Sequence, residues 1–310
     1  MDFLRMLAEI RTPGGTAFFR ACTWLGEEVC VVAVLCLLFW CIDKRAAYRI
    51  SFAYFASGLA VQILKITFRI ERPWVIDPEF LPVEEAMTTA TGYSFPSGHT
   101  QAATAMYGTL FLCAVTWQTK QKVKKILCCF FSVLAVVLVG ISRMYLGVHT
   151  PKDVLVSFAV SFVLVLIVSY LYNTGKFEQH KKIVAVILMA ISVFAVVYAI
   201  VLGNAEIIPS ALVSDCAKAG GAGVGFAVGW YIETGRIQFL CRSEWRRNVV
   251  RYFLGIAVTL LLKSGLKVVL GDSLPANALR YFLVVLWIMA LFPAVIKTAA
   301  KLQYVGSCEK

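Results

Sequence analysis

Long apolar segments alternate with short polar loops along most of the chain. An α-helix of about 20 residues rises 1.5 Å per residue, which is enough to cross the ~30 Å hydrocarbon core of a bilayer. The pattern therefore predicts an all-α polytopic membrane protein with about nine spans. They are expected near residues 27–42, 47–66, 99–117, 124–142, 152–172, 183–203, 209–232, 250–270 and 279–297.

The composition supports this class. The 310 residues are 60% hydrophobic and 15% charged, whereas soluble domains contain roughly 25% charged residues. A formal net charge of +12 suggests nucleic acid as a partner, but the basic residues lie in short loops, where they act as topology signals. We therefore expect a bilayer and no nucleic acid. The ten cysteines show no metal-type spacing.

The loops also predict an orientation. Lysine and arginine cluster in the loops after spans one, three, five and seven. The positive-inside rule then puts the N-terminus outside a cell membrane and the C-terminus in the cytoplasm. Residues 1–26 are mildly amphipathic and broken at Pro13, so we expect them to lie along the interface.

A first polar cluster lies at the predicted end of the second span. Lys65 and Arg72 are seven positions apart, nearly two helical turns, and are expected on one face of a helix that Pro73 ends. These cations fit an anion site, or they reach lipid headgroups at the membrane boundary.

A second cluster opens the third span. Pro96 resists helix formation, Ser97 is a good helix N-cap, and Gly98 lets a ligand approach the backbone. The free N–H groups of the first turn then favour an anion such as phosphate. His99 lies in that turn and can give or take a proton. The alternative is an ordinary capped helix start.

A third cluster opens the fifth span. Thr150 suits the N-cap, Pro151 the first helical position and Asp153 the third. Asp153 can fold back towards one ring nitrogen of His149, which frees the other nitrogen as a nucleophile. Arg143 adds positive charge just before the loop. The alternative is a plain capping box beside a loop histidine.

The three clusters support a catalytic site more strongly together than any one of them does alone. The chain has three histidines, and His99 and His149 both begin helices on the predicted outer face, whereas His180 looks like a solvated loop residue. Fixed cations from the first and third clusters are what a phosphoryl group with two negative charges requires.

The combined pattern resembles the three-part signature of the type 2 phosphatidic acid phosphatase (PAP2) superfamily. That superfamily includes glucose-6-phosphatase, bacterial undecaprenyl pyrophosphate phosphatases and vanadium haloperoxidases. The matching residues are Lys65-x6-Arg72-Pro73, Pro96-Ser97-Gly98-His99 and Ser142-Arg143-x5-His149-x3-Asp153. The resemblance implies a six-helix-type phosphatase core bundle over residues 27–175, after an interfacial segment 1–26 and before a transmembrane extension 176–310. Nine spans with an outside N-terminus are similar to the glucose-6-phosphatase layout.

The resemblance also implies roles. His149 would attack phosphorus and form a phosphohistidine, Asp153 would orient it, and His99 would protonate the leaving oxygen and later activate water. No metal or other cofactor is implied. The phosphate-binding groups would be Lys65, Arg72, Ser97, the Gly98 N–H and Arg143.

The predicted function is a metal-independent phosphatase that cleaves phosphate monoesters or pyrophosphates at the outer face. Lipid substrates are favoured because the site lies at the bilayer boundary; undecaprenyl pyrophosphate, phosphatidate and phosphatidylglycerophosphate are candidates. A phosphotransferase to an acceptor alcohol, a sugar-phosphate phosphatase and a non-catalytic lipid-phosphate transporter are the alternatives. The substrate and the oligomeric state stay open.

The last four predicted spans carry few chemical signals. Gly221, Gly225 and Gly229 form a small-residue stripe, which favours close helix packing. Lys263 and Lys267 are unusual so near apolar sequence, and their role stays open.

Overall fold

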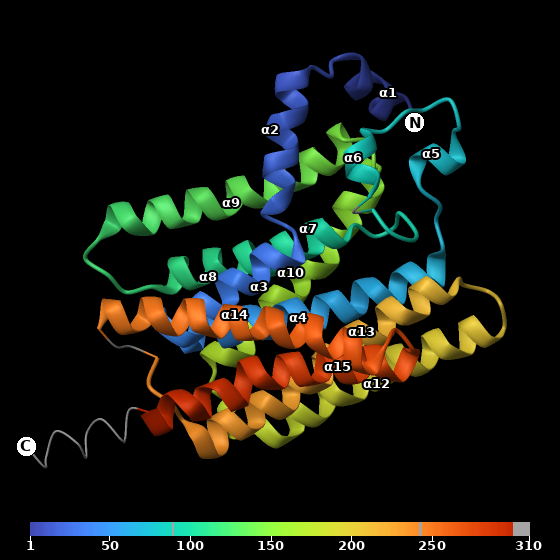
Figure 1. The fold of residues 1–310 in the computed structure, drawn as a ribbon. Helices are drawn as coiled ribbons and strands as arrows, with labels where there is room; N and C mark the ends of the chain where they lie inside the picture. Colours follow the sequence, from blue (N-terminus) through green and yellow to red (C-terminus); the bar gives the residue numbers. More distant parts are fainter. Residues whose placement is uncertain (89, 242–243, 300–310) are drawn as a thin grey trace, which may run out of the picture. The chain divides into compact units, whose positions relative to one another are not determined.

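The computed structural model describes residues 1–88, 90–241 and 244–299. The regular structure in this part of the chain is helical, as Figure 1 shows, and the predicted all-α class is confirmed. The chain forms two compact units. The first contains Met1–Val32 and Arg49–Asn173, and the second contains Ala33–Tyr48 and the chain from Thr174 onward.

The first unit contains the two N-terminal helices, the start of α3, most of α4, and the helices up to α10. These elements are α1 (Asp2–Glu9), α2 (Pro13–Trp24), α3 (Glu28–Leu37), α4 (Lys44–Phe68), α5 (Pro73–Ile76), α6 (Glu84–Met87), α7 (Gly98–Ala103), the π-helical η2 (Thr104–Gly108), α8 (Thr109–Thr116), α9 (Lys122–Tyr145) and α10 (Pro151–Asn173).

The second unit contains the end of α3, the start of α4 and the C-terminal helices. Its further elements are η1 (Leu38–Ile42), α11 (Lys176–Gln179), α12 (Lys181–Asn204), α13 (Ser210–Ile232), η3 (Glu233–Ile237), α14 (Trp245–Leu270), α15 (Leu274–Leu286) and η4 (Trp287–Leu291).

The predicted close packing of the glycine stripe is confirmed inside the second unit. A Cβ atom added at Gly221 would lie 2.1 Å from the carbonyl oxygen of Ala278, and one at Gly225 would lie 2.6 Å from that of Phe282. Only glycine lets the α13 backbone approach α15 so closely.

The count of nine spans is not confirmed. Among the described residues, six helices are long and apolar enough to cross a membrane. A seventh is added if the pair of α2 and the α3–η1 helix, bent by 48°, is one span. The predicted third span is divided into α7, η2 and α8, and the predicted seventh, α13, is rich in glycine and buried within its unit. Helices covered by protein need less apolar sequence than helices facing lipid.

The N-terminal segment belongs to the first unit. The backbone N–H of Thr12 donates to the Tyr145 hydroxyl at 3.1 Å, and Arg11 Nε donates to the Tyr145 carbonyl at 2.9 Å. Arg5 also pairs with Asp77 at 2.7 Å. The segment is therefore fastened to the end of α9 and to the loop after α5.

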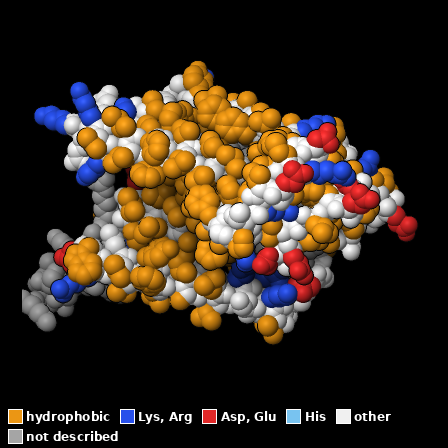
Figure 2. Space-filling view, turned by 90° about the horizontal axis from the view of Figure 1, so that it is seen from above, with side chains coloured by type: hydrophobic (Ala, Val, Ile, Leu, Met, Phe, Trp, Pro, Cys, Tyr) orange, Lys and Arg blue, Asp and Glu red, His pale blue; other side chains and the backbone are white. Residues whose placement is uncertain are grey.

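Hydrophobic side chains cover much of the face shown in Figure 2, while charged side chains gather towards its ends. The exposed fractions of single side chains agree: on helix α14, Leu261 is 71% and Val268 86% exposed. Apolar exposure on this scale is unfavourable in water and is typical of a surface covered by lipid.

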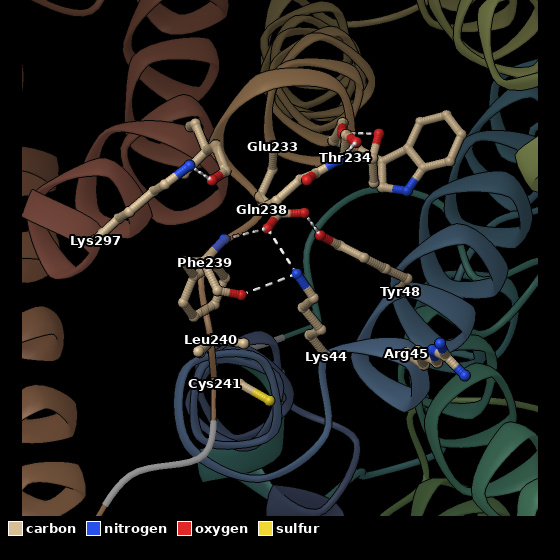
Figure 3. A network of polar contacts seen from close by, with 12 residues as sticks. Lys44, Arg45, Tyr48, Glu233, Thr234, Gln238, Phe239, Leu240, Cys241 and Lys297 are labelled. Carbon is tan, nitrogen blue, oxygen red and sulfur yellow. Dashed lines mark hydrogen bonds and ion pairs between the residues drawn. The ribbon is translucent and has the colours of Figure 1, made fainter. Parts of the chain in front are cut away.

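A buried polar network in the second unit ties the start of α4 to η3 (Figure 3). The Glu233 carboxylate is fully buried and accepts hydrogen bonds from Lys44 Nζ at 3.0 Å, from the Phe239 N–H at 3.2 Å and from the Tyr48 hydroxyl. Lys44 Nζ also donates to the Phe239 carbonyl at 3.0 Å.

Replacing Glu233 tests this network. Glu233→Ala removes the acceptor of Lys44, of the Tyr48 hydroxyl and of the Phe239 N–H, and leaving a buried donor unsatisfied costs about 1–3 kcal/mol. We expect a melting temperature several degrees lower in detergent, with Arg236→Ala, an exposed neighbour in η3, as the matched control. Equal melting of the two variants would mean that the network contributes little.

Candidate active site

The first predicted cluster differs from expectation in its backbone. Helix α4 ends at Phe68, and Arg69 has a left-handed φ of 52°, so the chain turns before Arg72. Arg72 is extended and precedes the short helix α5, which starts at Pro73. The expectation that Lys65 and Arg72 share one helical face is therefore wrong. Both side chains are nevertheless buried.

The two cations hold the loop that leads to the second cluster. Lys65 Nζ donates to the Tyr93 carbonyl at 2.8 Å. Arg72 Nε donates to the Gly92 carbonyl at 2.9 Å, and its Nη2 donates to the Thr91 carbonyl at 2.8 Å. The first cluster thus fixes the loop over residues 91–93.

The second cluster begins α7 as predicted. The Ser97 Oγ atom accepts the Thr100 N–H at 3.4 Å and the Thr100 hydroxyl at 3.0 Å, which confirms the N-cap. Gly98 is exposed, and a Cβ atom there would meet nothing within 4 Å. His99 Nε2 is buried without a hydrogen-bond partner. Open space therefore lies in front of Gly98, and a ring nitrogen of His99 is available.

The third cluster forms the predicted capping box. The Thr150 N–H donates to Asp153 Oδ2 at 2.7 Å, and the Asp153 N–H donates to the Thr150 hydroxyl at 3.4 Å. His149 Nδ1 lies 3.7 Å from Asp153 Oδ2, which is too long for a hydrogen bond. The Ser94 Oγ atom is nearer to both, at 2.6 Å from Asp153 Oδ2 and 3.4 Å from His149 Nδ1.

The other ring nitrogen of His149 faces a cation from the first cluster. Arg72 Nη1 lies 3.1 Å from His149 Nε2 and also donates to the Val148 carbonyl at 2.9 Å. Burial lowers the pKa of His149 well below its ordinary value near 6.5, and the charges of Arg72, Arg143 and Lys65 lower it further. The imidazole is therefore neutral at neutral pH.

Arg143 differs from Arg72 because much of its guanidinium has no protein partner. The side chain is fully buried, and Nη1 contacts the Thr23 hydroxyl at 2.8 Å. Its Nε and Nη2 atoms are buried without a hydrogen-bond partner. An unsatisfied buried donor costs about 1–3 kcal/mol, so these N–H groups favour an incoming oxygen anion.

Sequence reasoning missed Ser94 and Thr23. Ser94 lies 59 positions from Asp153, and Thr23 lies 120 positions from Arg143. No local pattern marks either residue, since each is an ordinary small polar side chain near an apolar segment. Thr23 also comes from the segment expected to lie outside the core.

The assembled groups suit an anion better than a cation. Three cations, a helix N-terminus and two histidines lie close together. The Asp153 carboxylate among them already accepts hydrogen bonds from Ser94 and Thr150. Among the described residues, no group of three or more His, Cys, Asp or Glu side chains is arranged to hold a metal ion.

Two family patterns match the chain. Residues 46–177 match the PAP2 superfamily, and residues 217–301 match the PAP2 superfamily phosphatase, transmembrane extension. The first match contains all three clusters. The second covers much of the C-terminal part of the chain.

Similar proteins include two curated phosphatases. Phosphatidylglycerophosphatase B of Bacillus subtilis (strain 168) is 34% identical over 103 residues, which are 32% of this chain and 48% of that protein. Sphingosine-1-phosphate phosphatase 2 of Mus musculus is 29% identical over 147 residues, which are 47% of this chain and 40% of that protein. The chain thus matches less than half the length of each.

A solved structure also resembles the chain, the transmembrane PAP2 type phosphatidylglycerolphosphate phosphatase from Bacillus subtilis. It is 24% identical, covers 56% of this chain and 84% of its own, and superposes with a TM-score of 0.47. On the two family matches, this chain belongs to the PAP2 superfamily and carries that family's transmembrane extension.

Proposed function

We propose that the chain is a metal-independent phosphatase that removes phosphate from a membrane lipid through a phosphohistidine at His149. The observation that carries the proposal is a set of buried nitrogen atoms without partners, namely Nε and Nη2 of Arg143 and Nε2 of His99. A phosphoryl group supplies the oxygens that these nitrogens lack. Because His149 is buried and neutral beside them, a nucleophile lies next to an anion site.

His149 Nε2 is the attacking atom. It forms a bond to phosphorus while the bond between phosphorus and the leaving oxygen breaks. His99, which carries a proton on both ring nitrogens once the phosphate dianion is bound beside it, gives the leaving oxygen one of them. Water then attacks phosphorus, His99 takes a proton from the water, and the Nε2–phosphorus bond breaks. Inorganic phosphate leaves, and both histidines return to their starting forms.

The phosphoryl oxygens meet donors from all three clusters. Arg143 offers Nε and Nη2, and the open space before Gly98 admits an oxygen to the backbone N–H groups of α7. Ser97 and Lys65 complete the binding set. Arg72 Nη1 lies against His149 Nε2 without substrate, so it turns to the phosphoryl oxygens when the group enters. These fixed charges stabilise the developing charge of the transition state.

We propose a lipid phosphate monoester as substrate. The two curated relatives are named for phosphatidylglycerophosphate and sphingosine-1-phosphate. The site lies at the ends of membrane-spanning helices, where the apolar part of a lipid stays in the bilayer. A long-prenyl pyrophosphate is the second substrate class.

We further propose that the site faces the outside of a cell membrane. The alternation of basic loops supports this orientation, with the N-terminus on the same side. The predicted cytoplasmic C-terminus lies outside the described residues.

Phosphate release by purified protein tests the function. In detergent with a chelator present, we expect wild-type protein to release phosphate from a diacyl lipid phosphate faster than from glucose 6-phosphate. His149→Ala removes the nucleophile and is expected to abolish release. His180→Ala removes an exposed histidine and serves as the matched control.

The other outcomes separate the alternatives. Phosphate transferred to an added alcohol instead of water would indicate a phosphotransferase. Release that disappears with chelator would contradict the metal-independent mechanism. No release by folded protein, with lipid-phosphate transport persisting in His149→Ala, would favour a transporter.

A titration of His149 tests the state of the nucleophile. Burial and the neighbouring cations lower its pKa, so its ring is expected to stay neutral as the pH falls below about 6.5, the ordinary value. An unfolded chain takes up this proton first, so the low pKa also reduces stability as the pH falls below that value. NMR of ¹⁵N-histidine-labelled protein, assigned with His149→Gln, measures the titration. A His149 pKa at or above 6.5 without substrate would contradict the account.

A further inference from the structure

The Nδ1 atom of His149 lies closer to the hydroxyl of Ser94 than to the carboxylate of Asp153. Ser94 Oγ lies 3.4 Å from His149 Nδ1 and 2.6 Å from Asp153 Oδ2. The direct distance from His149 Nδ1 to Asp153 Oδ2 is 3.7 Å, beyond hydrogen-bond range. All three side chains are buried, so water does not compete for these contacts.

Arg72 settles the direction of these contacts. A guanidinium can only donate hydrogen bonds, so His149 Nε2, at 3.1 Å from Arg72 Nη1, accepts through its lone pair. A neutral imidazole with Nε2 as acceptor carries its proton on Nδ1. That proton points to Ser94, which accepts it through the Oγ atom and also lies within reach of the ring through its backbone.

The Ser94 hydroxyl then has its own proton free to donate. Asp153 Oδ2 is an acceptor at 2.6 Å and also accepts the Thr150 N–H at 2.7 Å. Three hydrogen bonds therefore follow one another: Arg72 donates to His149 Nε2, His149 Nδ1–H donates to Ser94, and the Ser94 hydroxyl donates to Asp153. Each of these groups then donates or accepts a hydrogen bond as its chemistry allows.

We propose that Ser94 is a positioning residue that connects His149 to Asp153 and holds the imidazole with its proton on Nδ1. This inference rests on the proposed function, in which His149 Nε2 attacks phosphorus. As the Nε2–phosphorus bond forms, the ring becomes positive and its Nδ1–H becomes a stronger donor. Ser94, polarised by Asp153, accepts that hydrogen bond, and no proton has to leave the ring.

The loop around Ser94 is built to keep it in place. The Ser94 N–H donates to the Ile70 carbonyl at 2.8 Å. The preceding carbonyl of Tyr93 is held by Lys65, and that of Gly92 by Arg72. The first cluster thus fixes the serine that orients the nucleophile of the third cluster.

Kinetics of Ser94→Ala test the proposal. We expect kcat to fall about 10- to 100-fold, the range for outer hydrogen-bond partners that orient a reacting group, with KM little changed because Ser94 does not touch the substrate. Ser94→Thr keeps a hydroxyl and should recover part of the loss. Ser192→Ala removes another buried serine hydroxyl, within α12, and is the matched control.

A double variant shows whether Ser94 acts through Asp153. If the two form one line, Asp153→Asn should lower kcat far less in the Ser94→Ala background than in wild-type protein. Independent, multiplicative losses would overturn the proposal. So would an unchanged kcat in Ser94→Ala.

NMR tests the same contact without any turnover. In ¹⁵N-histidine-labelled protein, the His149 signals should report a proton on Nδ1, with a slowly exchanging Nδ1–H proton. This proton should exchange faster in Ser94→Ala and be retained in Ser192→Ala. A proton on Nε2 in wild-type protein would overturn the inference. Because this result does not depend on phosphate release, it separates failure of the Ser94 contact from failure of the proposed function.

Discussion

The candidate site depends on a buried guanidinium whose N–H donors outnumber the acceptors that the protein offers them. Arg143 is fully buried, yet its Nε and Nη2 have no partner in the described structure. A protein tolerates such a group only when the rest of the fold compensates, since each orphan donor costs about 1–3 kcal/mol. An oxygen anion would remove that penalty, and this supports the proposed phosphate site.

The other cations differ from Arg143 because they also build the scaffold. Arg72 donates to two carbonyls of the loop before Ser94 and contacts His149, while Lys65 holds the Tyr93 carbonyl. A change at either residue therefore alters both the charge and the shape of the site. Replacing Arg72 with lysine would keep the charge but lose the planar guanidinium, whose several N–H groups make these contacts simultaneously.

The helix caps of the site could be predicted from the sequence, because a capping hydrogen bond joins residues only three positions apart. Ser97 and the Thr150–Asp153 box follow rules that act over three residues, and both are found as expected. The prediction that Lys65 and Arg72 share one helical face was wrong because Arg69 takes a left-handed backbone conformation. No sequence rule signals that conformation at a non-glycine residue. Ser94 was missed because its partners are distant in sequence.

The count of nine spans is not confirmed by the structure. Helix α13 is rich in glycine and largely buried, and the predicted third span is divided into α7, η2 and α8, so neither is a single long apolar helix. The bounds of the helical segments themselves were predicted closely.

The most direct test of the central claim is calorimetric binding of inorganic phosphate to wild-type and Arg143→Gln protein in detergent. The account predicts affinity lower by about 10- to 100-fold in the variant, which corresponds to loss of a charge-assisted hydrogen bond. Arg20→Gln, which removes an exposed arginine paired with Glu85, should bind like wild type. Equal phosphate affinity in folded Arg143→Gln protein would contradict the claim that this buried guanidinium holds the phosphoryl group.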